Sequence, residues 1–424
     1  MQDLQSRSPY PRPSSSDSAF TYMPTVDGLR GIAILLVLCY HAPFLFRDLP
    51  EFSGQQTPWA MLGVLGRMSL GGWIGVDLFF VISGFLITSI LIRLRDGGGT
   101  SWVFWGRRGL RILPLAMLYL LVLFVLTWLG DPLKLLPHFE GWAWYAFYLG
   151  NIHIAMYGWQ PLAVMILWSL AIEEQFYLVW PLLVRMCSIR QLLWWSGGLV
   201  VVAPLVRAFT LSAADYPATY VFTLCRLDAL AAGAVVAVLF GSRTWQEKAA
   251  GLCKRLAPLA SVLIVITLLV PFSPSLPQTR PWLFSIFGYS WLAISFAVLL
   301  GASLDARGPI RAALTSPLLM FLGRRCYGLY LWHVLVAGFV TACLHSLQVG
   351  FIAHVVLWLG ALVIVASGSW LLIEEPILRL KRFLPYVQKQ PVQLEPHRVA
   401  STAAWWPPVV RPNDLPAPQT TEDT

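Results

Sequence analysis

Residues 72–93 read GWIGVDLFFVISGFLITSILIR, and this stretch decides the fold class. An α-helix needs about 20 consecutive, mainly apolar residues to cross the hydrocarbon core of a bilayer, and this run reaches that length. Further runs of the same kind occupy 29–46, 110–130, 165–184, 191–210, 225–241, 257–272, 283–302, 326–345 and 350–373. The sequence therefore predicts an all-α polytopic membrane protein with about ten transmembrane helices in one bundle.

The composition of the whole chain supports this prediction. Of its 424 residues, 57% are hydrophobic and only 12% are charged, whereas a soluble domain carries about 25% charged residues. An ordinary soluble enzyme is thereby excluded. The net charge of +9 comes from basic residues between the apolar runs, where the positive-inside rule accounts for them, so no nucleic-acid partner is expected. The 6 cysteines show no metal-ligand spacing, and no metal site is expected.

The charged connections predict on which side of the membrane each helix ends. Cytoplasmic loops are rich in Lys and Arg, and the connection 93–111 carries Arg93, Arg95, Arg107, Arg108 and Arg111. All the basic connections fall on one side only if the short apolar segment 142–157 does not cross. Both termini are therefore predicted to be cytoplasmic, and 142–157 is predicted to be a re-entrant or interfacial segment.

The two ends of the chain differ from the middle. Residues 1–28 are polar and rich in Pro and Ser, which predicts a disordered arm followed by an uncleaved first helix. Residues 384–424 are rich in proline with no apolar period, which predicts a disordered cytoplasmic tail. The membrane domain is expected over 29–380.

The first predicted helix carries Asp27, Arg30 and His41. Arg30 and His41 are eleven residues apart, so they point in directions that differ by about 20° and lie about 16 Å apart along the axis. Asp27 falls close to the same face. An arginine at the membrane edge can bind phosphate, and a buried imidazole can take and return a proton. The alternative is a snorkelling arginine and a histidine hydrogen-bonded within the bundle.

The next two predicted helices carry more charge. Asp77 lies within an apolar run and needs a partner inside the bundle, for which Arg30 and Arg108 are candidates. It can serve as a counter-ion or in chemistry. Arg107, Arg108 and Arg111 form either an anion-binding cluster or a simple marker of topology.

The fourth span contains adjacent carboxylates, Glu173 and Glu174. Because neighbouring residues on a helix point about 100° apart, they cannot both face one partner. A buried acid without a partner is costly, so at least one of them is expected to border a polar cavity.

Two later stretches combine polar side chains. Arg226 and Asp228 flank a leucine and are expected to pair with each other. Tyr327, Tyr330 and His333 recur on one helix face, a spacing typical either of a cavity lining or of an interfacial aromatic belt.

Several of these strings together resemble the membrane-bound acyltransferase 3 family, whose members O-acylate sugars and related acceptors. The family's arginine–ten residues–histidine pattern falls on Arg30 and His41, and its Arg-x-x-Arg pattern falls on Arg108 and Arg111. The family architecture also has ten membrane helices. The resemblance covers roughly 25–380 and rests on Asp27–Gly31 with His41, Gly75–Leu86, Arg107–Pro114, Trp168–Pro181, Tyr327–His333 and Glu374–Pro376. One departure is an aspartate, Asp228, where the family is expected to carry a proline or glutamate nearby.

The resemblance implies an integral-membrane O-acyltransferase of the bacterial inner membrane. It implies O-acetyl transfer from acetyl-CoA, a co-substrate and no resident cofactor, to a cell-surface or exported polysaccharide, lipid-linked sugar or other glycoside. It also implies roles for individual residues. Arg30, Arg108 and Arg111 would hold the CoA phosphates, and His41 would act as general base or as transient acyl carrier. Glu173 or Glu174 would orient or reprotonate the imidazole. The matching strings supply the supporting residues Asp27, Asp77, Ser83, Trp168, Ser169, Tyr177, Tyr330 and His333.

Other readings of the same residues stay open. Buried histidines and glutamates can form the proton relay of a membrane transporter, although that class predicts inverted repeats, which the sequence does not display. A non-catalytic scaffold would use the proline-rich tail but leaves the buried charges unexplained. Because the chain lacks the esterase-like domain fused to some family members, a separate extracytoplasmic partner is an option, as is a homo-oligomer.

Overall fold

The computed structural model describes residues 23–46, 49, 66, 69–136, 139–213, 216–269, 282–344, 347 and 349–386. These residues form helices and no strand, and 9 of the helices are long and apolar enough to cross a membrane. The long helices are α1 (Pro24–Leu45), α4 (Ile74–Asp96), α5 (Ser101–Trp128), α8 with α9 (Leu162–Met165 and Leu167–Met186), α10 (Ile189–Ala213), α13 (Arg243–Leu269), α14 (Tyr289–Leu304), α16 (Pro317–Leu344) and α17 (Phe351–Ser369). A shorter apolar helix, α12 (Leu227–Phe240), completes the bundle, and each predicted span corresponds to one of these elements. The all-α polytopic prediction is confirmed.

The boundaries differ from the prediction where charged residues begin a helix. α5 begins at Ser101, about nine residues earlier than expected, so its arginines lie on the helix and not in a loop. α1 likewise begins at Pro24, inside the segment predicted to be a disordered arm. The rest of that arm, and the tail beyond 386, lie outside the described residues.

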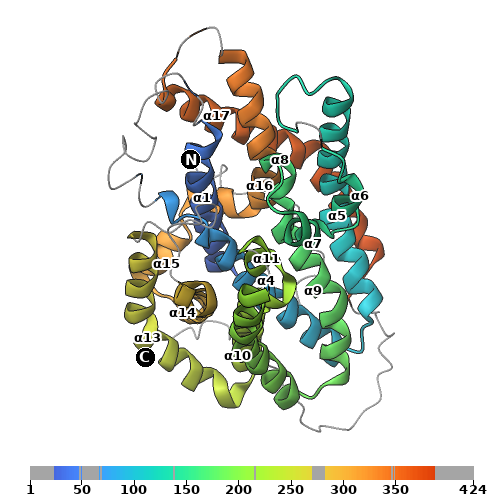
Figure 1. Cartoon of the computed structure of the whole chain (residues 1–424). Helices are drawn as coiled ribbons and strands as arrows, with labels where there is room; N and C mark the ends of the chain where they lie inside the picture. Colours follow the sequence, from blue (N-terminus) through green and yellow to red (C-terminus); the bar gives the residue numbers. More distant parts are fainter. Residues whose placement is uncertain are drawn as a thin grey trace, which may run out of the picture.

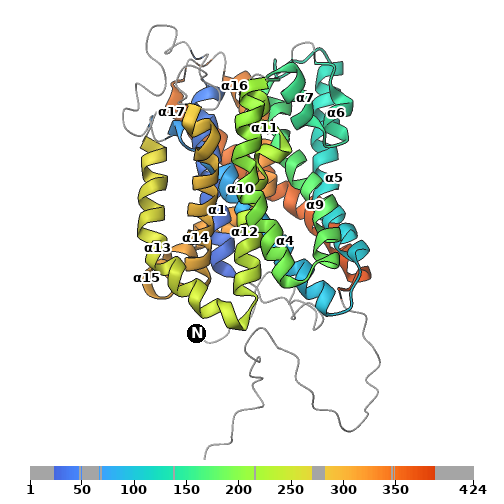
Figure 2. The same ribbon diagram turned by 60° about the horizontal axis from the view of Figure 1, so that its bottom comes forward.

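The long helices pack together in one bundle (Figure 1), and Figure 2 shows α6 (Trp142–Ala146) and α7 (Gly150–Tyr157) at one end of this bundle and α15 (Gly308–Leu314) at the other. α12 packs directly on α4. The approach is close because it occurs at glycines: a Cβ on Gly84 would lie 1.9 Å from the Leu230 carbonyl oxygen, and one on Gly233 would lie 2.0 Å from that of Val81. Small residues at such crossings are how membrane helices gain van der Waals contact.

The segment 142–157 forms no crossing helix, as predicted. It folds into α6 with 5 residues and α7 with 8, far fewer than the about 20 that a span requires. Asn151 on α7 donates to the Thr223 hydroxyl at 2.8 Å and accepts from the Gln175 amide at 2.9 Å. These partly buried hydrogen bonds tie α7 to the bundle.

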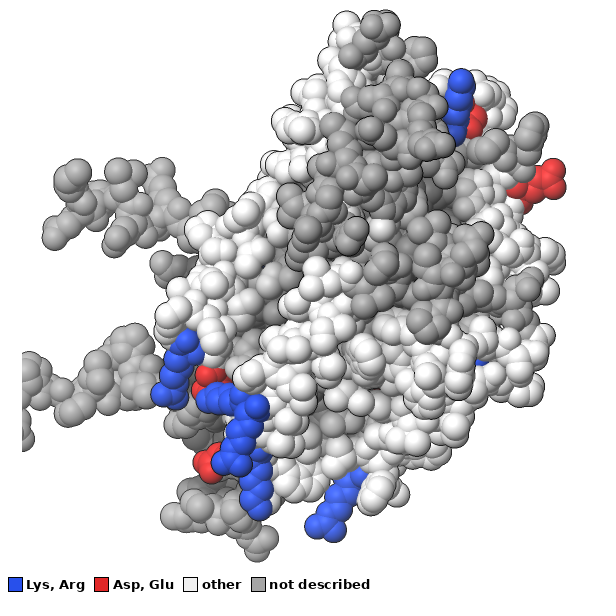
Figure 3. Space-filling view, turned by 60° about the vertical axis from the view of Figure 1, so that its left-hand side comes forward, with Lys and Arg blue, Asp and Glu red and all other residues white. Residues whose placement is uncertain are grey.

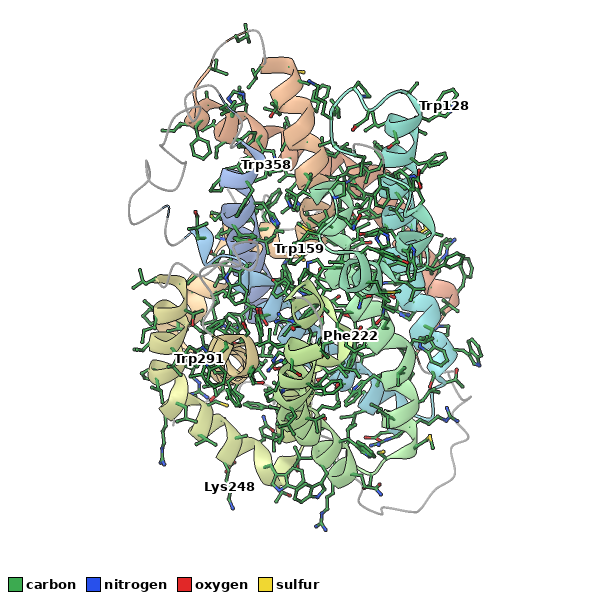
Figure 4. The ribbon with its side chains drawn as sticks, in the orientation of Figure 1. Trp128, Trp159, Phe222, Lys248, Trp291 and Trp358 are labelled. Carbon is green, nitrogen blue, oxygen red and sulfur yellow. The ribbon has the colours of Figure 1, made fainter. Side chains whose placement is uncertain are left out.

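Basic side chains gather toward one end of the bundle. Figure 3 shows Lys and Arg concentrated at the lower end of one face. Lys248 on α13 lies at this end, whereas Trp128, the last residue of α5, lies at the opposite one (Figure 4). Below, these are called the basic end and the far end.

Candidate active site

A cavity opens among α1, α4, α5, α9 and α16, and we call it the arginine cavity. Its charged lining residues are Arg30, Arg108, Arg111 and Glu173. Arg30 comes from α1, whereas Arg108 and Arg111 lie one turn apart on α5 and therefore share a face. The structure thus brings the three predicted arginines together in one lining.

The lining of the arginine cavity carries three arginines and one carboxylate, that of Glu173. Arg30 lies 3.3 Å from the Asp27 carboxylate, which partly neutralises it. Arg108 lies 3.6 Å from Glu173 and 4.0 Å from Glu174. Arg111 makes no ion pair within the described part of the chain. A cavity with this balance favours an anionic ligand, and guanidinium groups suit phosphate oxygens.

Glu173 holds Arg108 in place. One oxygen of Glu173 accepts from the Ser83 hydroxyl at 2.7 Å, and the other accepts from the Tyr177 hydroxyl at 2.9 Å. The Arg108 guanidinium also lies over the Tyr177 ring, 4.1 Å from its centroid. With both oxygens engaged, Glu173 acts as an anchored counter-ion that fixes the direction of Arg108.

A second, larger cavity lies toward the far end, and we call it the histidine cavity. His41 lines it, together with Lys134, Gln160 and many aromatic side chains. The aromatic lining residues are Tyr40, Phe44, Trp73, Trp159, Trp168, Tyr220 and Tyr330.

The two cavities adjoin. Val76 and Tyr330 line both of them. The Tyr330 hydroxyl lies 2.8 Å from the Ser169 hydroxyl and donates to the Ile166 carbonyl at 2.6 Å. Tyr330 and Ser169 thus form the partition between an arginine-lined space and a histidine-lined space.

His41 is oriented by the backbone and by a second histidine. Its Nδ1 lies 3.0 Å from the Val37 carbonyl oxygen, so Nδ1 carries the proton and Nε2 carries the lone pair. The ring of His333 lies 4.8 Å from that of His41. His333 Nδ1 lies 2.6 Å from the Tyr330 carbonyl oxygen, and its Nε2 is buried with no hydrogen-bond partner among the described residues. His41 therefore has the form needed to accept a proton or an acyl group at Nε2.

The glutamates lie elsewhere than expected. Glu173 or Glu174 is predicted to orient or reprotonate His41, but both lie against Arg108. The groups beside His41 are Val37, Tyr40 and His333. The physical reason is their position along α9. The glutamates lie about one helical turn nearer the basic end than Ser169, and Ser169 itself lies at the partition, so both glutamates are on the arginine side of it.

Asp77 pairs with Arg226, and not with Arg30 or Arg108 as expected. The two side chains are fully buried and 2.6 Å apart. The predicted pair of Arg226 with Asp228 is also wrong, because Asp228 pairs with Arg207 of α10 at 2.9 Å. Ser290 of α14 joins this second pair by donating to Asp228 at 2.7 Å. Sequence reasoning missed Arg207, whose position inside the apolar run 191–210 was the available signal.

Loss of the Asp77 carboxylate is expected to destabilise the bundle. Asp77→Asn leaves the Arg226 cation buried, where Nε and Nη1 already lack hydrogen-bond partners among the described residues. Breaking one side of a buried pair costs about 3–5 kcal/mol. Unfolding of the purified protein in detergent measures this loss. The control is Glu375→Gln, which breaks an exposed pair with Arg379 and should cost under about 1 kcal/mol. Equal losses would show that Asp77 is not the counter-ion that matters.

Comparison with known proteins places the chain in a family. The acyltransferase 3 model, described as an acyltransferase domain, matches residues 23–374. The chain therefore belongs to this family of membrane acyltransferases. It is 28% identical over 387 residues to peptidoglycan O-acetyltransferase OatA of Listeria monocytogenes, covering 86% of this chain and 57% of the relative. It is 29% identical over 338 residues to "Putative O-acetyltransferase SAS0844" of Staphylococcus aureus, covering 75% of this chain and 51% of that relative.

The chain spans about half the length of these curated relatives. No solved structure matches it. The family assignment confirms the resemblance that the sequence motifs indicated.

Proposed function

We propose that this protein transfers an acetyl group from acetyl-CoA, held at the basic end, to a hydroxyl of a glycan or glycoside held in the histidine cavity. The observation that carries the proposal is the adjoining pair of cavities, one lined by Arg30, Arg108 and Arg111 and the other by His41. Phosphates of the donor suit the first. The aromatic walls of the second suit a sugar. The name of the Listeria relative makes a peptidoglycan strand one candidate acceptor.

His41 performs the proton transfer in this proposal. Nε2 takes the proton of the acceptor hydroxyl while the oxygen bonds to the acyl carbon, and the carbon–sulfur bond breaks. The imidazolium then returns its proton to the CoA thiolate. In the second form of the mechanism, Nε2 attacks the acyl carbon, the carbon–sulfur bond breaks and CoA leaves as the thiolate. The acceptor oxygen then bonds to the acyl carbon as the nitrogen–acyl bond breaks, and the hydroxyl proton passes to the thiolate. Both forms require the extended arm of the donor to bridge the about 16 Å between Arg30 and His41 along α1.

The proposal sets the orientation of the chain. The membrane is the bacterial inner membrane, and the basic end faces the cytoplasm, where acetyl-CoA is made. A reporter that works only outside the cytoplasm should be inactive when fused after Arg382 and active when fused at Gly130, between α5 and α6. Fusion after Arg190 is the control and should be inactive. An active tail fusion would contradict the orientation.

The reaction is tested by its product. A bacterial host that lacks this activity is compared with and without the chain, and acetate released from its surface glycans by mild base is measured. We expect base-labile acetate only when the chain is present. If a well-expressed chain leaves glycans unchanged but moves protons or a solute across vesicles, the protein is a transporter and the proposal is wrong.

A further inference from the structure

Lys134 is unusual among the residues that line the histidine cavity. It is the only Lys, Arg, Asp or Glu among the described lining residues. The side chain is exposed, and it makes no ion pair within the described part of the chain. A lone ammonium group in an otherwise uncharged cavity attracts a negatively charged group of a ligand.

The backbone holds Lys134 in a strained position. Its φ of 52° lies in the left-handed region, as does the φ of 49° at Asp131. Residues with a side chain rarely adopt this conformation, and such strain is often found at functional positions. Two hydrogen bonds hold the turn at 131–136. The Asp131 carboxylate accepts from the N–H groups of Leu135 and Leu136 at 2.9 and 2.7 Å, and Leu136 is buried.

The remaining walls of the histidine cavity suit a sugar ring. Trp159, which Figure 4 labels near the middle of the view, lines it beside Trp168 and Tyr220. The centroids of the Trp168 and Tyr220 rings are 4.8 Å apart, with the ring planes tilted by 49°, and both rings contribute to the cavity wall. The C–H faces of a pyranose pack on such walls. Gln160 donates through Nε2 to the Gly158 carbonyl at 2.9 Å, which leaves its Oε1 to accept from a sugar hydroxyl.

We propose that the acceptor is an anionic glycoside, a pyranose with a carboxylate or phosphate group, and that Lys134 binds this group. The sugar ring packs on the wall formed by Trp168 and Tyr220, and its reacting hydroxyl points toward His41. This inference rests on the proposed function for placing the acceptor in the histidine cavity. Lys134 then decides which acceptors bind and takes no part in the chemical step.

The probes are methyl β-glucoside, methyl β-glucuronide and methyl β-glucoside 6-phosphate, which share one ring and differ only at C6. Each is titrated by calorimetry into the full chain in lipid nanodiscs. We expect both anionic glycosides to bind roughly three- to tenfold more tightly than the neutral one. The tighter of the two anionic probes identifies carboxylate or phosphate as the preferred group.

Variants distinguish the effect of the Lys134 charge from that of the electrostatic field of the other charged residues. Lys134→Asn removes the charge and tolerates the left-handed backbone, so the anionic preference should disappear while the neutral glycoside binds as before. Lys134→Arg should keep the preference. Lys248→Asn, at the basic end, is the control and should change nothing. Equal binding of the three probes, a preference that survives Lys134→Asn, or no binding of any probe overturns the inference. Titration of acetyl-CoA into the same samples tests the proposed function separately.

Discussion

His41→Ala should lower acyl transfer by at least about a hundredfold, because a positioned acid–base group typically contributes 10²–10⁴. The physical reason is the loss of Nε2, the only basic atom of this imidazole that the Val37 hydrogen bond leaves available. Release of base-labile acetate from glycans measures activity. The abundance and thermal unfolding of the variant show whether the protein still folds and inserts.

The control replaces a histidine that lies away from both cavities. His153 lies on α7, outside the lining of both cavities, and burial lowers the pKa of its imidazole. His153→Ala should therefore retain activity. His41→Gln adds a second comparison, because an amide keeps polarity and some volume but cannot take a proton. Normal acetylation by well-expressed His41→Ala would show that His41 has no part in the mechanism. An equal loss of activity in His41→Ala and His153→Ala would point to a structural cause.

The sequence predicts much of the bundle because helix periodicity and hydrophobic length act locally. Arg30 and His41 were expected on one face from their spacing, and they line adjoining cavities. The boundary of α5 was missed for a physical reason. Arginines lower the apolar signal of 101–110, yet the helix tolerates them because Arg108 finds an ion-pair partner in Glu173.

Pairings between distant helices could not be predicted. Asp77 and Arg226 are far apart in sequence, and their contact depends on the close packing of α4 on α12 at Gly84 and Gly233. No local pattern carries that information. The position of Lys134 could not be predicted either. It lies in an ordinary polar connection, and only the fold of the loop places it beside the histidine cavity.

Replacing Arg108 and Arg111 by lysine should weaken acetyl-CoA binding. Lysine keeps the charge, and therefore the topology, but it lacks the planar fork that grips two phosphate oxygens. A charge-assisted hydrogen bond contributes about 1.5–3 kcal/mol, which corresponds to roughly a ten- to hundredfold change in affinity for each one lost. Arg108 is held over the Tyr177 ring by Glu173, so its direction is set before the donor arrives.

The measurement is a calorimetric titration of acetyl-CoA into the wild type and the double variant in nanodiscs. The matched control is Arg307→Lys with Arg311→Lys, which changes two arginines at α15 that line neither cavity. We expect the control to bind like the wild type. If Arg108→Lys with Arg111→Lys also binds like the wild type, these arginines only mark topology, and the donor phosphates bind elsewhere. If the wild type itself does not bind at millimolar acetyl-CoA, the donor half of the proposed function is wrong. The arginine cavity and the histidine cavity adjoin at Tyr330. If the double variant binds acetyl-CoA more weakly but binds methyl β-glucuronide normally, the two substrates bind on opposite sides of that partition.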